Sequence, residues 1–233
     1  MPSPPENRTA LLPALERLSG DEPRCAFIWL HGLGADGHDF EPIVDEFDLA
    51  RLPPTRFVFP HAPMRPVTIN GGYVMRAWYD VVSADFSSGR EEANQLRESA
   101  ARISALIARE NERGIPDRRI VLAGFSQGGV LALHTGLRHP RRLAGVVALS
   151  CYLPLPDTLA AEAAPENADL PLFIAHGRAD PVIPYDYGAS SARLLKACGY
   201  PVHWHAYQAA HGVCADELQD IENWLAVALG EAG

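Results

Sequence analysis

The chain has 233 residues, of which 47% are hydrophobic and 21% charged, and its formal net charge is −9. This length suits one substantial α/β domain and is short for two, so we expect a single domain over residues 1–233. Because no basic run offsets the negative charge, the composition argues against nucleic acid and anionic membrane surfaces as main partners.

Cysteine usage and the N-terminus indicate the compartment. The four cysteines are widely spaced and form no C-x-x-C pair, which in a chain of this size favours free thiols in a reducing compartment. Residues 1–10 are Pro-rich, lack the apolar core of a signal peptide and predict a loose tail. No apolar run approaches the roughly 18–20 residues that span a bilayer. We therefore expect a cytoplasmic protein without stable membrane insertion.

The first quarter of the chain predicts strands separated by turns. Residues 11–18 fit either an edge strand or a short helix. Residues 25–31 form an apolar run bounded by turns, which is typical of a strand buried on both faces. Three glycines within residues 31–38 indicate a loop whose backbone closely approaches another group. Apolar residues at helical spacing follow over 39–50, and residues 56–60 form the next short strand.

Residues 61–89 form a long excursion without a long regular element. Loops of this length in compact domains are usually functional or disordered, and the composition here is not that of a disordered segment. Asn70-Gly71 lies between β-forming residues and predicts a hairpin over 67–75. We interpret the excursion as a cover for one edge of the active site inferred below, and a purely structural flap is the alternative.

Strands and helices alternate after this excursion. The pattern Ser88-x-x-Glu91 predicts a capping box that opens a long amphipathic helix, and Gly114 and Pro116 end it. Residues 151–169 give no clear element. Further strands are expected over 145–150, 170–176 and 202–207, and helices over 127–138, 189–197 and 216–229. This alternation predicts an α/β fold with a mostly parallel central sheet and helices on both faces.

The stretch 119–134 organises the function. It consists of an apolar run, then Gly124-Phe-Ser-Gln-Gly128, then an apolar-periodic segment, which predicts a strand, a tight turn and a helix with Ser126 at the apex. In this context G-x-S-x-G is typical of the nucleophile elbow of α/β hydrolases. Glycines are needed because side chains at these positions would collide with the neighbouring strand or helix. The alternative is a βα turn that only happens to carry a serine.

A nucleophilic serine needs a general base and a group that orients the base. In α/β hydrolases the acid and then the histidine follow the serine, each on a loop at the carboxyl end of a strand. Asp180 follows a predicted strand by a short Gly-containing loop, whereas Asp169 precedes that strand and Asp157 lies in unassigned chain. His211 lies in the loop after the last predicted strand, where the base belongs.

The other histidines suggest structural roles. His31 and His176 end strands and precede glycines, so we expect them to shape their loops. His203 and His205 share one face of a strand, a spacing that can chelate a metal, but the sequence arrays no obvious carboxylate or cysteine beside them. We therefore expect no metal and no organic cofactor.

These residues predict acyl transfer through an acyl-enzyme. His211 takes the hydroxyl proton as Ser126 attacks an acyl carbonyl, and Asp180 holds the imidazole tautomer. The backbone N–H groups of Leu33 and Gln127 receive the oxyanion, and each such donor contributes about 3–4 kcal/mol. His211 then protonates the leaving alcohol or thiol, and water cleaves the acyl-enzyme. Activity is therefore expected to fall on acidification.

Several motifs, in order and spacing, resemble one family. They are His31-Gly-Leu-Gly-Ala-Asp-Gly-His38, Pro66-Val-Thr-Ile-Asn70 with Trp78-Tyr-Asp80, Gly124-Phe-Ser-Gln-Gly-Gly129, Leu149-Ser-Cys-Tyr-Leu-Pro154 and His176-Gly-Arg-Ala-Asp-Pro-Val-Ile-Pro184. From about Cys25 onward the chain is similar to the phospholipase/carboxylesterase family, which includes bacterial carboxylesterases and eukaryotic acyl-protein thioesterases. One departure is Gln208-Ala-Ala before His211, where the family often has a Pro-containing segment.

The resemblance implies an α/β-hydrolase fold and hydrolysis of carboxylic esters, thioesters or lysophospholipids. It also implies the same catalytic residues and oxyanion donors, namely Ser126, Asp180, His211, Leu33 and Gln127. Family members can dimerise, so either a monomer or a homodimer is expected. The details around Ile69 and Met75 are closer to the bacterial enzymes, which favour small acyl esters.

We therefore predict a serine carboxylesterase for short-to-medium acyl esters. The alternatives are an acyl-protein thioesterase or lysophospholipase acting on longer acyl chains, and a non-catalytic scaffold that binds a small molecule or partner. The expected acyl-pocket walls are Trp78, Leu153, Val182 and Val213, although core packing would equally explain each of them.

Overall fold

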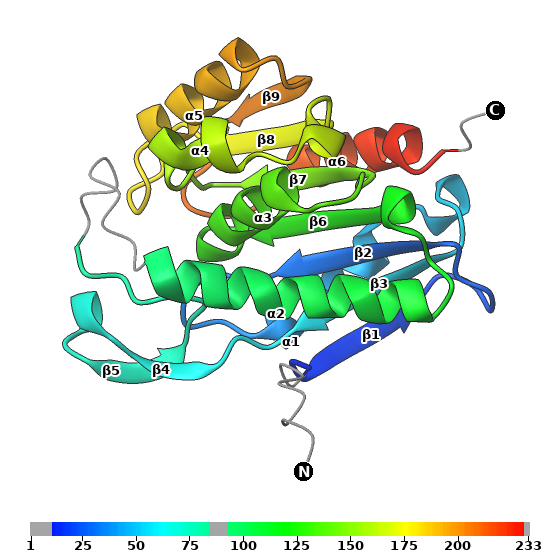
Figure 1. Cartoon of the computed structure of the whole chain (residues 1–233), viewed down its shortest axis with the longest axis horizontal. Helices are drawn as coiled ribbons and strands as arrows, with labels where there is room; N and C mark the ends of the chain where they lie inside the picture. The colour runs from blue at the N-terminus through cyan, green and yellow to red at the C-terminus, as the bar shows by residue number, and fades with distance from the viewer. Residues whose placement is uncertain (1–10, 84–92, 231–233) are drawn as a thin grey trace, which may run out of the picture.

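The computed structural model of the protein describes residues 11–83 and 93–230 and is built around a seven-stranded sheet (Figure 1). The strand order is β1-β3-β2-β6-β7-β8-β9, and all neighbours are parallel except β1, which runs antiparallel to β3. The predicted α/β architecture with a mostly parallel sheet is therefore confirmed. Residues 1–10, 84–92 and 231–233 lie outside the described part, and with them the predicted loose tail and the predicted capping box.

The strands coincide closely with the predicted apolar runs. They are β1 (Ala14–Leu18), β2 (Cys25–Leu30), β3 (Thr55–Pro60), β6 (Ile120–Phe125), β7 (Gly145–Leu149), β8 (Leu172–Gly177) and β9 (Val202–Tyr207). Every residue of β2, β7 and β8 is buried, as parallel strands covered on both faces require. The first segment, for which sequence left strand or helix open, is the half-exposed edge strand β1.

Helices cover both faces of the sheet and create two cores (Figure 1). One face carries α2 (Ala93–Glu112), α3 (Gln127–Arg138), α4 (Pro156–Glu162) and α5 (Tyr185–Ala197). The other carries α1 (Gly37–Phe40), a 3-10 helix (Glu41–Glu46) and α6 (Ala215–Ala228). None of the described helices is both long and apolar enough to cross a bilayer.

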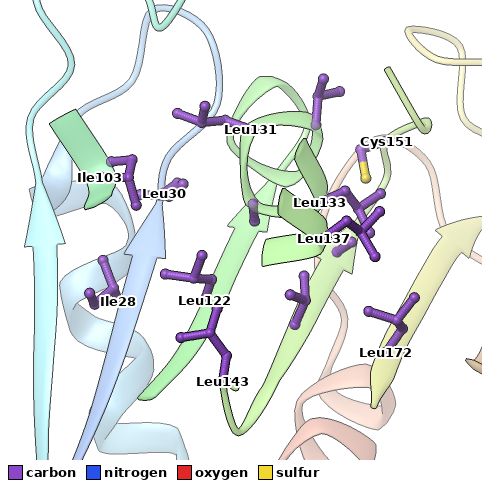
Figure 2. Packing of buried hydrophobic residues seen from close by; sticks show 14 of the residues in the cluster. Ile28, Leu30, Ile103, Leu122, Leu131, Leu133, Leu137, Leu143, Cys151 and Leu172 are labelled. Carbon is purple, nitrogen blue, oxygen red and sulfur yellow. The ribbon is translucent and has the colours of Figure 1, made fainter. Parts of the chain in front are cut away.

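Alternation along the strands supplies both cores. Ile28 and Leu30 of β2 belong to the core under α2 and α3, whereas Phe27 and Trp29 belong to the core under α6. Figure 2 shows the first of these cores, where leucines of α3 lie over side chains of β2 and β6. The second core is rich in aromatic rings, and its T-shaped contacts include Phe27 with Trp29 at 5.6 Å between ring centroids.

Three segments differ from the predicted elements. The helical spacing over 39–50 corresponds to α1, the 3-10 helix Glu41–Glu46 and a short 3-10 turn (Leu49–Arg51). Pro42 lacks the N–H that would continue α1, and the Asp48 side chain accepts a hydrogen bond from the Ala50 N–H and starts a new turn. Apolar periodicity fixed the buried face here, but it did not distinguish one helix from three short ones.

The unassigned segment 151–169 contains α4 and a 3-10 turn (Pro165–Asn167). Each begins with a proline, because proline is well tolerated in the first turn, where its missing N–H is not needed. Helix α5 begins at Tyr185, four residues before the predicted start at 189. The predicted start was too late because Gly188, a residue that disfavours helix interiors, lies in the first turn. A Cβ at Gly188 would lie 2.3 Å from His176 Nδ1, so the helix needs glycine there for close packing.

The predicted hairpin is present as β4 (Met64–Val67) and β5 (Tyr73–Arg76), which pair antiparallel as a separate two-stranded sheet. A short 3-10 turn (Thr68–Asn70) and the left-handed residues Gly71 and Gly72 connect the two strands. The Asp80 carboxylate accepts hydrogen bonds from the Thr68 N–H and hydroxyl and so ties the turn to the chain beyond β5.

Candidate active site

Ser126 lies between the end of β6 and the start of α3, in a strained conformation with φ 55° and ψ −121°. The two glycines of the motif make this turn possible. A Cβ at Gly124 would lie 2.3 Å from the Gly128 backbone, and a Cβ at Gly128 would lie 2.0 Å from the Leu30 carbonyl oxygen on β2. The turn is therefore packed so closely against the adjacent strand that no side chain fits at either position.

The structure brings the three predicted catalytic side chains together. Ser126 Oγ lies 3.0 Å from His211 Nε2, and His211 Nδ1 lies 2.7 Å from Asp180 Oδ2. Because a carboxylate only accepts, His211 Nδ1–H is the donor to Asp180, which leaves Nε2 free to accept the serine proton. The Phe125 ring packs on the imidazole, with ring centroids 4.7 Å apart.

The acid is held by its own loop after β8. Asp180 Oδ1 accepts hydrogen bonds from the N–H groups of Val182 at 2.8 Å and Ile183 at 2.9 Å. His176 Nε2 donates to the Ile183 carbonyl oxygen at 2.8 Å and lies 3.3 Å from Asp180 Oδ2. Burial lowers the pKa of His176, so this fully buried ring acts as a neutral clamp on the acid loop.

The histidine loop is tied to the acid loop although it departs from the family pattern. The Ala179 N–H donates to the Ala209 carbonyl oxygen at 3.0 Å, and the Arg178 N–H donates to the Tyr207 carbonyl oxygen at 2.8 Å. A Cβ at Gly177 would lie 2.3 Å from the Ala210 carbonyl oxygen, so the two loops are in direct contact. The Gln208-Ala-Ala segment therefore does not keep His211 from its place.

A cavity of about 550 Å³ opens over Ser126. Its polar residues include Ser126, Gln127 and His211, and its walls are mainly apolar: Leu33, Phe40, Ile69, Tyr79, Val81, Phe125, Val130, Tyr152, Val182 and Ile183. An apolar pocket with a few convergent polar groups is the usual form of a small-molecule site. The excursion after β3 contributes to the wall through Ile69, Tyr79 and Val81, as its interpretation as an edge cover requires.

The two predicted oxyanion donors both line this cavity. Gln127 is the first residue of α3, where N–H groups have no partner within the helix. In the described part of the chain neither its N–H nor that of Leu33 makes a hydrogen bond. The Leu33 loop is fixed by Gly34, whose φ is 78° and whose N–H donates to the Arg76 carbonyl oxygen at 2.9 Å. Both amides are therefore available to a ligand.

Of the four residues predicted as pocket walls, one lines the cavity and three do not. Val182 lines the cavity, and Trp78, Leu153 and Val213 are not among its lining residues. Leu153 is buried in the core near α5, where its N–H donates to Ser191 Oγ at 2.8 Å. Val213 packs against the core under α6. Trp78 is fully buried, and its indole N–H donates to the His31 carbonyl oxygen at 2.8 Å. These three positions fit the core-packing explanation.

Part of the actual wall was not predicted from the sequence. Phe40 and Val130 lie in segments whose apolar periodicity predicts only a buried helical face, and no local pattern distinguishes a cavity wall from core. Tyr152 was a stronger clue, because it comes three residues after the end of β7 and so lies near the carboxyl edge of the sheet, where Ser126 also lies.

One other polar cluster lies beside the oxyanion loop. Within the described residues Asp36, His38 and His61 place possible metal-binding atoms within 4.8 Å of one another. Their atoms already have local roles. Asp36 caps α1 by accepting from the His38 N–H, and His61 Nδ1 accepts from the Gly37 N–H at 3.1 Å. The expectation that no metal is needed stays a prediction.

Comparison with known proteins places the chain in a family. Residues 18–229 match the phospholipase/carboxylesterase family. Acyl-protein thioesterase 1 of Neurospora crassa is 39% identical over 224 residues, which cover 92% of this chain and 89% of that protein. Acyl-protein thioesterase 1 of Yarrowia lipolytica is 38% identical over 202 residues, covering 85% of this chain and 89% of that protein.

Solved structures of related proteins have the same fold. The crystal structure of acyl-protein thioesterase 2 of Zea mays has a TM-score of 0.82 and 30% identity, and the match covers 94% of this chain and 99% of that one. Esterase PE8 has a TM-score of 0.80 and 26% identity, with the same coverage of 94% and 99%. The chain therefore belongs to the phospholipase/carboxylesterase family of α/β hydrolases and is a hydrolase of the esterase and thioesterase class.

Proposed function

We propose that this protein is a serine hydrolase that releases acyl groups from thioesters through an acyl-enzyme on Ser126. The observation that carries the proposal is the contact chain from Ser126 Oγ through His211 to Asp180, at 3.0 and 2.7 Å, on the floor of an apolar cavity. A bare thioester needs no charged recognition group, which agrees with walls made of aliphatic and aromatic side chains.

The chemistry follows from the contacts. Ser126 Oγ attacks the acyl carbonyl while its proton moves to His211 Nε2, and Asp180 stabilises the imidazolium through Nδ1–H. The carbonyl oxygen becomes an oxyanion that accepts from the N–H groups of Leu33 and Gln127. The thiolate leaves with the proton held by His211. Water then attacks the acyl-enzyme with His211 again as the base and releases the acid.

The substrate class is where our expectation from sequence changes. Details of two motifs favoured a carboxylesterase for short-to-medium acyl esters, with acyl-protein thioesterase as the alternative. The relatives at 38–39% identity are named acyl-protein thioesterases, which makes the alternative the better-supported one. A cavity of about 550 Å³ also supports an acyl group larger than acetyl. Each methylene that enters it contributes about 0.8 kcal/mol, or roughly fourfold in affinity.

The nucleophile is tested by covalent labelling. A fluorophosphonate probe should label the wild type and not Ser126→Ala. Ser104→Ala is the matched control, because Ser104 lies on α2 and its hydroxyl only donates to the Ala100 carbonyl oxygen. Labelling that persists in Ser126→Ala and maps to another serine would contradict the proposal.

The substrate is tested by an acyl-chain series. Thioesters of one thiol, and oxygen esters of one alcohol, are compared from acetyl to palmitoyl by kcat/KM. We expect thioester hydrolysis to rise by up to about fourfold per methylene until the cavity is full. A maximum at acetyl or propionyl in both series would instead support the short-chain carboxylesterase. Turnover of lysophospholipids in preference to both series would support a lysophospholipase.

The non-catalytic scaffold is the remaining alternative, and an unlabelled, inactive wild type would favour it. A cytoplasmic location and a monomeric or homodimeric state stay predictions. The cysteines at 25, 151, 198 and 214 are all free thiols, as a reducing compartment predicts.

A further inference from the structure

Trp78 and Tyr79 form a bridge between the two segments that carry the proposed oxyanion donors, the loop after β2 with Leu33 and the start of α3 with Gln127. On one side, the Trp78 indole Nε1–H donates to the His31 carbonyl oxygen at 2.8 Å, two residues before Leu33. On the other side, the Trp78 backbone N–H donates to Gln127 Oε1 at 2.8 Å, and Gln127 Nε2 donates to the Tyr79 carbonyl oxygen at 2.7 Å. One dipeptide is therefore hydrogen-bonded to both segments.

These contacts are buried, so water does not compete for them. Trp78 is 0% exposed and Tyr79 is 2% exposed. The Trp78 carbonyl oxygen also accepts from the Ser99 hydroxyl of α2, which anchors the bridge to the helix layer. A hydrogen bond broken at such a site leaves a buried donor or acceptor unsatisfied, which makes each bond matter more than a surface bond would.

The His31 side of the bridge is fixed from several directions. The His31 and Trp78 rings pack with centroids 5.1 Å apart. His31 Nδ1–H donates to the Gly32 carbonyl oxygen at 2.7 Å, and Nε2 accepts from the Ala62 N–H at 3.0 Å. Burial lowers the pKa of His31 to about 4, so the neutral ring that this pattern needs is the form present at neutral pH.

We propose that Trp78 is a positioning residue that sets the separation of the Leu33 and Gln127 amides. This inference rests on the proposed function. Oxyanion donors act only when held about 2.7–3.1 Å from the developing charge, and a misplacement of about 1 Å can lower the rate a hundredfold. The two segments follow different strands, so the covalent chain does not fix the spacing of their amides. The Trp78–Tyr79 bridge fixes it, because its hydrogen bonds to both segments run through the same rigid dipeptide.

This role differs from that of a pocket wall in a measurable way. Trp78 does not line the cavity, whereas its neighbour Tyr79 does. A wall residue changes the preference among acyl chains, because each chain touches it to a different extent. A residue that positions the oxyanion hole acts on the carbonyl oxygen, which all these substrates share. Loss of the Trp78 indole N–H should therefore slow all acyl chains by the same factor.

The test is Trp78→Phe, which keeps an aromatic ring and removes the indole N–H. We expect kcat to fall by roughly tenfold to a hundredfold at every acyl length, with KM within about twofold, because the interaction is one of the transition state. The inhibition constant of a trifluoromethyl ketone, whose adduct carries an oxyanion, should rise by the same factor as kcat/KM falls.

The matched control is Trp29→Phe. Trp29 is 1% exposed, lies in the core on the other face of the sheet, and its indole nitrogen is buried without a hydrogen-bond partner in the described residues. Both variants lose a similar amount of buried ring, so a fall in melting temperature is expected in both. Only Trp78→Phe should change kcat and the ketone inhibition constant by more than about twofold.

Ser99→Ala provides a second, milder variant if Trp78→Phe does not fold. It removes the hydroxyl that donates to the Trp78 carbonyl oxygen and leaves the indole in place. The same uniform loss of kcat, smaller in size, is expected. Wild-type values of kcat and ketone inhibition in folded Trp78→Phe would overturn the inference, and so would a loss confined to long acyl chains. An unlabelled wild type would instead refute the proposed function itself.

Discussion

The proposed catalytic edge of the sheet and the apolar wall of the cavity both border the space over Ser126, yet they are built differently. At the edge, Ser126, Asp180 and His211 each follow a strand of one sheet, and hydrogen bonds of 2.7–3.0 Å join their side chains. The wall draws single apolar side chains from separate segments, such as Phe40 of α1, Val81 beyond β5 and Val130 of α3. Packing alone holds these side chains.

The difference teaches which part of the site can vary. Moving a catalytic side chain would break directional bonds whose geometry the sheet sets, so the edge tolerates little change. When one apolar side chain of the wall is exchanged for another, only the shape of the cavity changes. We therefore expect chemistry and acyl preference to be separable, and the following changes either break or sharpen that separation.

The largest effect is expected at the acid. Asp180→Asn keeps the size of the side chain, but its amide can present a donor to His211 and favour the wrong tautomer. Loss of the acid in such triads lowers kcat by about 10⁴-fold. The loss should be the same for short and long acyl chains, measured as kcat/KM on two substrates. Asp169→Asn is the control, since Asp169 is exposed and pairs with Arg142. A loss that depends on chain length would mean that edge and wall are coupled.

Sequence predicted the edge because strand ends are marked locally. Gly124 and Gly128 indicate the elbow. The loop after β8 contains one suitable acid, Asp180, and the loop after β9 contains one suitable base, His211. The order of strands in the sheet then brings them together without further information. The parallel sheet itself follows from apolar runs that alternate with amphipathic helices.

The wall was not predictable in the same way. Trp78 is a large aromatic residue of the kind that often lines a pocket, but it lies in the core. Its indole N–H is satisfied there by the His31 carbonyl oxygen. Val130 has the periodicity of a core residue of α3, yet it lines the cavity. Which apolar side chain borders a void depends on how long-range packing closes around it, and a single sequence does not encode that in a local pattern.

The next largest effect is expected at the elbow. Gly128→Ala would place a Cβ 2.0 Å from the Leu30 carbonyl oxygen, which is backbone and cannot rotate away. Strand β2 or the helix start must shift, and we expect a loss of about 3 kcal/mol or more in the free energy of unfolding. Denaturant unfolding checks this against Gly212→Ala, where an added Cβ meets no atom within 4 Å. Equal stability of the two variants would show that the edge is less tightly built than described.

A smaller, pH-dependent effect belongs to His31. Burial lowers its folded-state pKa to about 4, whereas an unfolded histidine has a pKa near 6.5. Between these values the unfolded chain binds the proton and the folded chain does not, so stability falls as pH falls from about 6.5 to 4. The shift corresponds to about 3 kcal/mol. His31→Gln does not titrate there, so its stability deficit relative to wild type at pH 8 should shrink toward pH 4.

Urea unfolding of both proteins across this pH range measures the difference. His134, whose pKa burial also lowers to about 4, is unchanged in both proteins and cancels in the comparison. A gap between wild type and His31→Gln that stays constant with pH would mean that the pKa of His31 is the same in the folded and the unfolded chain. The loop that carries Leu33 would then be less dry than its burial indicates.

The smallest effect should arise at the wall and should leave the edge untouched. Val81→Phe adds a ring to a cavity-lining position beyond β5. Short acyl thioesters still fit beside Ser126, so their kcat/KM should stay within about twofold of the wild type. Each methylene displaced from the cavity removes about 0.8 kcal/mol, so long chains should lose roughly fourfold per methylene. Val227→Phe is the control, because Val227 is 83% exposed on α6. A uniform loss across chain lengths would place Val81 with the catalytic edge, because only groups that act on the shared carbonyl slow every substrate alike.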